Sequence, residues 1–222
     1  SIVTSDFVSN VTHELKTPLT SIRGFIDTLK NGAIEDKVVA HKFLDIIDVE
    51  AERLYSLIQD ILLLSEIESA KDKEVMLCRV DKIAGEVVEL LNQKVHDHVT
   101  LVYEPEPVTP YPCNPDRMKQ LLINLVDNAI KYTEEGTIKV ECKEEDNILL
   151  IRVKDTGIGM AKEHLDRIFE RFYRVDKGRG RKQGGTGLGL SIVKHIAELY
   201  NGSIRVDSKE NEGTTFEIRF PY

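Results

Sequence analysis

The sequence of 222 residues lacks features that mark whole classes of protein. It has no apolar run approaching the roughly 20 residues of a membrane helix, and no secretory signal opens it. Basic residues are outnumbered, 30 Lys and Arg against 38 Asp and Glu, and the net charge of −8 argues against binding nucleic acid by broad phosphate neutralisation. Because Ser1 already opens a polar, helix-like stretch, we expect a portion of a longer protein, whose preceding part can include a membrane span.

Cysteine is also scarce. Cys78, Cys113 and Cys142 are far apart and form no paired motif, which is typical of buried or partly buried thiols in a reducing compartment. A cytoplasmic location is therefore the default expectation. There is no internal repeat or low-complexity tract, and the apolar share of 41% supports an ordinary buried core.

Two long helices are predicted in the first part of the chain. The first runs from about Ser5 to Lys30, and Pro18 is expected to bend it because proline lacks an amide donor. After a break at Asn31-Gly32, the second runs from about Lys37 to Glu68. The broad apolar stripe of the second helix suggests that another hairpin covers it. The pattern predicts a homodimeric four-helix bundle.

His13 lies on the first helix but away from its apolar stripe. It is two residues from Leu15, about 160° around the helix at roughly 100° per residue, so it faces water beside Glu14. The stripe consists of Val8, Val11, Leu15, Leu19, Ile22, Ile26 and Leu29. Most exposed histidines on helices have no chemical role, so orientation alone leaves both interpretations open.

A polar stretch, Ser69–Glu74, separates the hairpin from a mixed α/β region, which gives two expected domains, 1–70 and 71–222. The predicted strands are Thr100–Tyr103, Thr137–Lys143, Ile148–Lys154, Ser203–Asp207 and Thr214–Phe220. The predicted helices are Asp81–Val95, Pro115–Tyr132, Ala161–Arg171 and Leu190–Tyr200. Asn114 is expected to cap the second of these helices, with Pro115 in its first turn.

The run Asn124–Tyr132 is the first of four that carry chemistry in the second domain. Asn124, Asn128 and Lys131 are spaced by four and three, so they share one face of a helix. Asparagine offers a neutral oxygen to hydrated Mg²⁺, and lysine offers a point charge to phosphate. An ordinary polar helix face is the alternative.

The second run, Asp155-Thr156-Gly157-Ile158-Gly159, ends an apolar strand. Its carboxylate can accept a hydrogen bond while the glycine backbone approaches a flat ligand closely. The same composition is common in turns, so an ordinary turn is the favoured interpretation when this run is read alone.

A glycine-rich run, Gly184–Leu190, opens the last predicted helix, where exposed backbone amides suit phosphate. It is neither a Walker loop nor a dinucleotide fingerprint. The basic tract before it suggests a flexible lid over an anionic ligand, with a solvated loop as the alternative; its residues are Lys177, Arg179, Arg181 and Lys182. In the fourth run, Phe169–Arg174, two aromatics can anchor the lid while an arginine reaches phosphate, although both aromatics are more typical of core residues.

Five runs in this order and spacing resemble the H, N, G1, F and G2 boxes of the sensor histidine kinases of two-component systems. They are His13–Leu19, Asn124–Lys131, Asp155–Gly159, Phe169–Phe172 and Gly185–Gly189, and none departs from the pattern. The resemblance covers essentially the whole chain. It implies a dimerisation and phosphoacceptor hairpin followed by an ATP-binding domain with the α/β sandwich shared with certain chaperone and topoisomerase ATPases. The chain is most similar to membrane sensors of Gram-positive bacteria that respond to phosphate or cell-wall state, of which it would be a cytoplasmic portion.

The resemblance implies roles for single residues. His13 would be the phosphoacceptor, Glu14 the general base that polarises its ring, and Thr17 would position a water that dephosphorylates the partner. That partner would be the receiver domain of a response regulator. Because ATP and His13 lie on different domains, the catalytic domain must swing, with Ser69–Glu74 as the natural hinge.

ATP and Mg²⁺ are the implied ligands of the second domain. Asn128 would bind Mg²⁺, Asp155 the adenine amino group and Arg174 the γ-phosphate, while Tyr132 would pack along the nucleotide. The other implied nucleotide-binding residues are Asn124, Lys131, Gly157, Gly159, Gly185, Thr186, Gly187, Leu188 and Gly189.

Three alternative functions compete with this interpretation. A zinc enzyme can begin with His-Glu, but its His-Glu-x-x-His motif needs a second histidine where this chain has Thr17. An ATP-driven conformational machine of the same superfamily would not need the exposed His13–Glu14 pair. A catalytically silent nucleotide-binding scaffold would not need the complete set of ATP-site residues.

Overall fold

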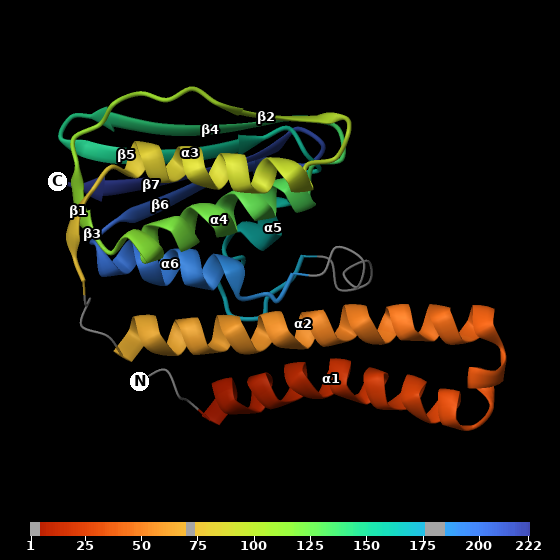
Figure 1. Cartoon of the computed structure of the whole chain (residues 1–222). Helices are drawn as coiled ribbons and strands as arrows, with labels where there is room; N and C mark the ends of the chain where they lie inside the picture. The colour runs from red at the N-terminus through yellow and green to blue at the C-terminus, as the bar shows by residue number, and fades with distance from the viewer. Residues whose placement is uncertain (1–4, 70–73, 176–184) are drawn as a thin grey trace. The chain divides into compact units, whose positions relative to one another are not determined.

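A computed structural model describes residues 5–69, 74–175 and 185–222. The chain divides into two compact units, Ser1–Ser65 and Glu66–Tyr222. In Figure 1 the colour runs along the chain from red at the N-terminus to blue at the C-terminus. The boundary falls inside the second long helix, so the last turn of that helix belongs to the second unit. No helix of the described ranges is long and apolar enough to cross a membrane.

The first unit is a helical hairpin. Helix α1 spans Ser5–Lys30 and continues through Pro18, and α2 spans Lys37–Ser69, so both predicted helices are confirmed. Between them, Gly32 has a φ of 123° and leads into the short 3₁₀ helix η1, Ala33–Glu35. Phe25 and Phe43 close the hairpin with an edge-to-face contact, their ring centroids 5.0 Å apart.

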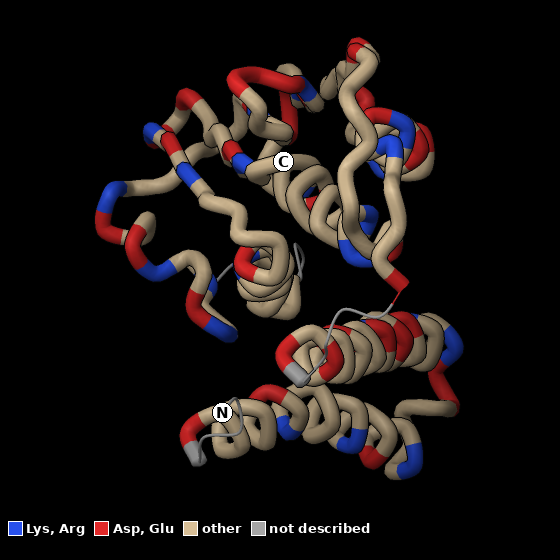
Figure 2. Tube along the Cα trace, turned by 90° about the vertical axis from the view of Figure 1, so that its left-hand side faces the viewer, with Lys and Arg blue, Asp and Glu red and all other residues tan. Residues whose placement is uncertain are grey.

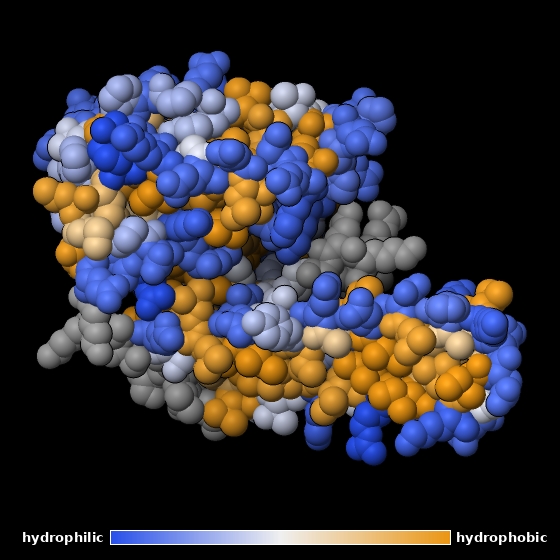
Figure 3. All heavy atoms as spheres, viewed as in Figure 1, coloured by the Kyte–Doolittle hydropathy of each residue, from blue (hydrophilic) through white to orange (hydrophobic). Residues whose placement is uncertain are grey.

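Many large apolar side chains of the hairpin stay on the surface of this single chain. Among them are Val8, Leu19, Ile26, Leu44, Ile58 and Leu62, whose exposed fractions run from 37% at Ile26 to 55% at Leu62. Figure 3 shows hydrophobic residues gathered in a long band on the hairpin. Contiguous exposed apolar surface of this kind is typical of an interaction surface.

The second unit is built on a five-stranded sheet with the order β2-β4-β5-β7-β6. The strands are β2 (Val99–Tyr103), β4 (Gly136–Glu145), β5 (Ile148–Asp155), β6 (Ser203–Lys209) and β7 (Gly213–Pro221). Only the β2–β4 pair is parallel within this sheet. All five predicted strands are therefore confirmed, with ends that differ by one or two residues.

Helices cover one face of that sheet, as Figure 1 shows for α3, α4 and α6. They span Val80–Leu91, Pro115–Lys131 and Gly189–Leu199, and α3 runs on into the 3₁₀ helix η2, Asn92–Lys94. The core between the two layers includes the buried apolar side chains of Leu122, Leu125, Ile151, Phe216 and Ile218. This two-layer arrangement confirms the predicted α/β fold of the second part of the chain.

The N-terminus of α4 forms as its sequence predicts. The Asn114 side chain accepts a hydrogen bond of 2.9 Å from the Asp116 amide, and Pro115 occupies the first turn. All three cysteines, Cys78, Cys113 and Cys142, are buried free thiols, as expected.

The predicted helix Ala161–Arg171 is wrong in length, because α5 covers only Lys162–Leu165. Beyond it, the amides of Arg167 and Glu170 bond three residues back, which makes successive turns instead of a continuous helix. The Ser191 hydroxyl donates a hydrogen bond to the carbonyl of Phe169 at 3.0 Å, so a tertiary contact takes the place of a helical hydrogen bond there. The prediction also missed a small antiparallel pair, β1 (Met76–Cys78) with β3 (Tyr111–Cys113).

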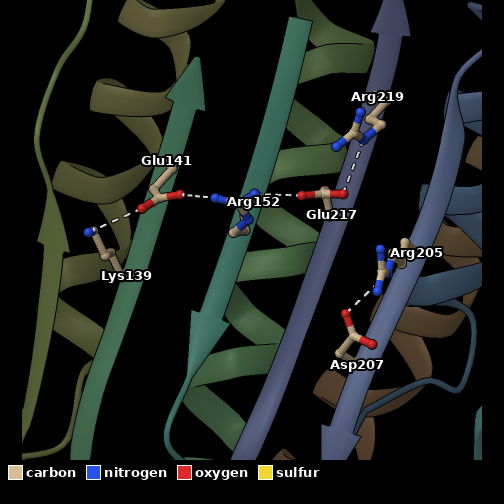
Figure 4. A network of polar contacts seen from close by, with 7 residues as sticks. All are labelled: Lys139, Glu141, Arg152, Arg205, Asp207, Glu217 and Arg219. Atoms are coloured by element: carbon tan, nitrogen blue, oxygen red, sulfur yellow. Dashed lines mark hydrogen bonds and ion pairs between the residues drawn. The ribbon is translucent and has the colours of Figure 1, made fainter. Parts of the chain in front are cut away.

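The face of the sheet turned away from the helices carries a row of ion pairs (Figure 4). Arg152 on β5 lies opposite Glu141 on β4 and Glu217 on β7, and donates to each at 2.6 Å. Lys139 and Arg219 extend the row at 3.1 Å to the same carboxylates. The hydrogen bond from Arg152 lowers the pKa of Glu217. Alternating charges directly across three strands stabilise this register. Elsewhere, Figure 2 shows acidic and basic residues interspersed along both units.

Candidate active site

The C-terminal end of α4 lies against the Asp155–Gly159 run. The amide of Ile158 donates to the carbonyl of Tyr132 at 3.0 Å. A Cβ added at Gly157 would lie 2.0 Å from that same oxygen, so only glycine allows the two backbones to approach this closely.

The glycine-rich run before α6 meets α4 at two other points. The side-chain amide of Asn124 donates to the carbonyl of Gly189 at 3.2 Å. The ammonium nitrogen of Lys131 lies 3.5 Å from the position of a Cβ at Gly185. The polar face of α4 predicted from its spacing therefore faces this run.

The Phe169–Phe172 run joins the site through Gly187. The Phe172 amide donates to the Gly187 carbonyl at 2.8 Å, and a Cβ at Gly187 would lie 2.8 Å from the Phe172 Cα. Both residues have positive φ, 64° and 80°. The four runs of the second unit, separated by up to 65 residues, thus come together around the C-terminal half of α4.

Asp155 is the buried carboxylate of this site, only 4% exposed at the end of β5. Its Oδ1 accepts from the amides of Gly157 at 2.9 Å and Thr214 at 3.3 Å. Burial raises the pKa of Asp155, and the two amide hydrogen bonds oppose that shift. Within the described ranges its Oδ2 has no protein partner, so an acceptor is left for a ligand.

Thr214 is a site residue that sequence reasoning missed. It reaches Asp155 because β7 pairs antiparallel with β5 and places the two residues opposite each other. They are 59 residues apart in the chain, so no local spacing signals the contact.

Some of the predicted site residues have a structural explanation of their own. Gly159, with φ 64°, packs so tightly that a Cβ would lie 1.9 Å from the Lys209 carbonyl. The Thr186 hydroxyl accepts from the Leu188 amide at 3.1 Å, and the Leu188 side chain is fully buried. In contrast, a Cβ at Gly189 would meet nothing within 4 Å.

Two further predicted residues of the second unit, Asn128 and Arg174, are both half-buried. Asn128 lies on α4 between Asn124 and Lys131, and Lys131 forms an ion pair of 3.1 Å with Asp127. The basic tract of the predicted lid lies outside the described residues, as do four of the six residues of the predicted hinge.

This set of groups fits a nucleotide. A buried carboxylate oxygen can accept a hydrogen bond from the exocyclic amino group of a base. The Thr133 hydroxyl, fully buried beside Gly157, also has no hydrogen-bond partner among the described residues. Asparagine and lysine side chains next to glycine amides suit phosphates.

The first unit carries the other predicted group of residues. His13 is exposed on α1, as its position off the apolar stripe predicts, and Glu14 beside it is half-buried. The exposed Thr17 donates from its hydroxyl to the His13 carbonyl at 3.3 Å. Among the described residues there is no cluster of His, Cys, Asp and Glu that can hold a metal ion, and the zinc alternative gains no support.

Two family models match the chain. Residues 4–70 match the His Kinase A (phospho-acceptor) domain, and residues 113–222 match the histidine kinase-, DNA gyrase B-, and HSP90-like ATPases. The chain belongs to the sensor histidine kinases. The resemblance predicted from the five runs is therefore confirmed, together with the fold class.

Known histidine kinases are similar over almost the whole chain. The sensor histidine kinase WalK of Bacillus subtilis is 39% identical over 223 residues, and WalK of Staphylococcus epidermidis is 40% identical over 230. These matches cover 98% and 97% of this chain, which spans 36% of the length of each relative. A solved structure of the histidine kinase ThkA in complex with the response regulator protein TrrA matches 97% of the chain and 61% of its own, with 28% identity and a TM-score of 0.76.

We predict that Asp155→Asn stabilises the histidine kinase fold in the absence of nucleotide. Asparagine keeps an oxygen for the two amides and removes a buried charge, so the free energy of unfolding at pH 7 should rise. The expected increase is roughly 0.5–2 kcal/mol, the range common for single stabilising substitutions. The raised pKa of Asp155 means that its carboxylate destabilises the fold above that pKa. The gain should shrink as the pH falls through the folded-state pKa, and vanish below the ordinary value of 3.8.

Urea denaturation at pH 7 and at lower pH measures this effect. The exposed Asp166→Asn serves as the matched control, with an expected change within about 0.5 kcal/mol. A loss of stability in Asp155→Asn at pH 7 would contradict the account.

Proposed function

We propose that this chain is the kinase portion of a sensor protein, in which residues 1–70 carry the phosphoacceptor and residues 71–222 bind ATP. ATP phosphorylates His13, and the phosphoryl group then passes to an aspartate in the receiver domain of a response regulator. The observation that carries the proposal is the convergence of four separate runs around α4, with an acceptor oxygen of Asp155 left for a ligand. ATP and its protein partner are cytoplasmic in bacteria, so we place this portion in the cytoplasm.

Each group of the site has an assigned role in binding ATP. Asp155 accepts from the adenine amino group, Tyr132 packs along the nucleotide, and Asn124 and Lys131 lie near the phosphates. Arg174 contacts the γ-phosphate. The rest of the cradle is formed by Gly157, Gly159, Gly185, Thr186, Gly187, Leu188 and Gly189, chiefly through their backbone.

Asn128 is the proposed ligand of Mg²⁺, since it offers a neutral side-chain oxygen from the same face of α4. When bound, Mg²⁺ neutralises phosphate charge that grows as the γ-phosphoryl group departs. The protein itself aligns the nucleotide and contributes the positive charge of Lys131.

At His13, an imidazole nitrogen forms the new bond to the γ-phosphorus while the bond from phosphorus to the β–γ bridging oxygen breaks and ADP leaves. Imidazole is available as a neutral nucleophile near neutral pH. Glu14, the neighbouring carboxylate, takes up or stabilises the proton of the ring as positive charge develops there. The exposure of His13 leaves it accessible to a second domain.

Incubation of the chain with γ-labelled ATP and Mg²⁺ tests this activity. We expect acid-labile, alkali-stable label, and at least a hundredfold less in His13→Gln, because glutamine is not a nucleophile for this transfer. A nucleotide-binding control shows that the variant still binds ATP. Undiminished label in His13→Gln would contradict the assignment, and nucleotide turnover without any label would favour an ATP-driven machine.

The reverse reaction, hydrolysis of the phosphorylated regulator, is assigned to a water that Thr17 positions. Thr17 lies one turn after His13, and its hydroxyl is exposed on the same helix. We predict that Thr17→Ala lowers phosphatase activity about tenfold or more while His13 autophosphorylation falls less than threefold, as expected for loss of one positioning hydrogen bond. Release of phosphate from the purified phospho-regulator measures it. Equal loss of both activities would refute the division of roles.

The partners are proposed from surfaces and relatives. The structural relative ThkA has been solved in complex with a response regulator protein, which supports a regulator as the partner here. The exposed apolar side chains of the hairpin support a homodimer, because two such hairpins can cover each other in a four-helix bundle.

We predict that Leu62→Glu, in the exposed apolar set of α2, shifts the chain from dimer to monomer. A buried unpaired charge in an apolar interface costs several kcal/mol, so the dimer dissociation constant should rise at least a hundredfold. Analytical ultracentrifugation at micromolar concentration measures the dissociation constant, with Leu90→Glu, at an exposed position of α3, as the control. A wild-type chain that sediments as a monomer would contradict the proposed dimer.

A further inference from the structure

Glu68 is a nearly buried carboxylate in the last turn of α2, the part of that helix that belongs to the second unit. Its side chain is only 9% exposed. One oxygen, Oε1, pairs with the guanidinium of Arg171 and lies 3.1 Å from Nε2 of His195. A carboxylate removed from water to this extent is stable only while it keeps such partners.

The two partners differ in charge. Arg171 supplies the opposite charge. Burial lowers the pKa of His195, so its ring is neutral near neutral pH, and its Nε2 lies within hydrogen-bonding distance of Glu68. Glu198 on the same helix lies 3.8 Å from the opposite ring nitrogen, and the charges of Arg171 and Lys194 also lower the pKa of His195.

Arg171 and His195 lie on the two chain segments that meet at the glycine-rich run. Arg171 immediately precedes Phe172, whose amide donates a hydrogen bond to the carbonyl of Gly187. His195 is one helical turn beyond Ser191, whose hydroxyl donates to the carbonyl of Phe169. The same carboxylate oxygen thus binds both the segment before this run and the helix after it.

We propose that Glu68 is a positioning residue for nucleotide binding, which connects the last turn of α2 to the geometry around Gly187. The inference rests on the proposed function of the site as an ATP site. Glu68 acts through Arg171 and His195 and does not touch the nucleotide. A change in α2 that moves Glu68 alters nucleotide affinity, and bound nucleotide by the same thermodynamic coupling favours one position of the helix end.

The first test compares Glu68→Gln with the wild-type chain. Equilibrium titration with a fluorescent ADP analogue gives the nucleotide Kd, and labelled ATP gives KM and kcat for His13. Because the ion pair to Arg171 is lost, we expect Kd and KM to rise about fivefold, a typical coupling between sites, while kcat at saturating ATP changes less than twofold. Glu66→Gln is the matched control, since Glu66 lies in the same turn, is 67% exposed and pairs with Arg117 at 3.4 Å. Its Kd should stay within twofold.

A double-mutant cycle with Arg171→Gln separates positioning from general destabilisation. If the two residues act as one unit, the double variant should have about the same Kd as either single variant, whereas independent effects would multiply. A second variant, His195→Asn, keeps the Glu68–Arg171 pair and provides the test if Glu68→Gln does not fold; its Kd should rise about twofold to threefold.

The outcomes are distinct. Unchanged Kd and KM in Glu68→Gln would overturn the inference; if that variant is unfolded, the same result in His195→Asn would do so. A lower kcat and a lower melting temperature at constant KM would overturn it as well. Multiplying effects in the cycle would also overturn it. A wild-type chain that binds no ADP analogue would instead contradict the proposed function, and the inference with it.

Discussion

The approach of two backbones at Gly157 and Tyr132 is the constraint on which the rest of the site depends. No side chain fits between the Gly157 Cα and the Tyr132 carbonyl, and the next amide bonds to that carbonyl. The end of β5 is therefore fixed against the end of α4. Asp155, two residues earlier, is oriented by the Gly157 amide, so its free oxygen and the polar face of α4 are held in one relative position. Packing alone therefore explains the glycine at position 157, before any ligand is considered.

Charge is distributed in two contrasting ways in the second unit. On the open face of the sheet, Arg152 has a carboxylate on either side, and Glu141 and Glu217 each have two basic partners. Inside the site, Asp155 has only neutral amides as partners. The open-face charges stabilise the register of the sheet, whereas the buried one weakens the fold and is the proposed acceptor for the nucleotide. Functional sites are commonly the places where a protein gives up stability in this way.

The sequence was sufficient for those elements whose own periodicity decides them. The ends of α1 and α2 and the Asn114 cap follow from local patterns, and so does the exposure of His13. The polar face of α4 also follows from spacing alone. What could not be predicted depends on segments that are distant in the chain. Thr214 reaches Asp155 only through strand pairing, and the turns after α5 replace a helix because Ser191 binds the Phe169 carbonyl. The three-residue strands β1 and β3 are too short for alternation to signal them, and β3 contains Pro112.

The three buried cysteines give the second unit built-in reporters of local opening. Cys142 lies within β4, and burial raises the pKa of its thiol to about 12, so a thiol reagent meets a neutral and shielded sulfur. Cys78 and Cys113 belong to the small sheet, where the Cys78 thiol donates to the Cys113 carbonyl at 3.4 Å. Labelling rates at these thiols therefore distinguish opening of the small sheet, next to the start of the unit, from opening of the central sheet. The native cysteines can in this way report which of the two sheets opens first, without an added probe.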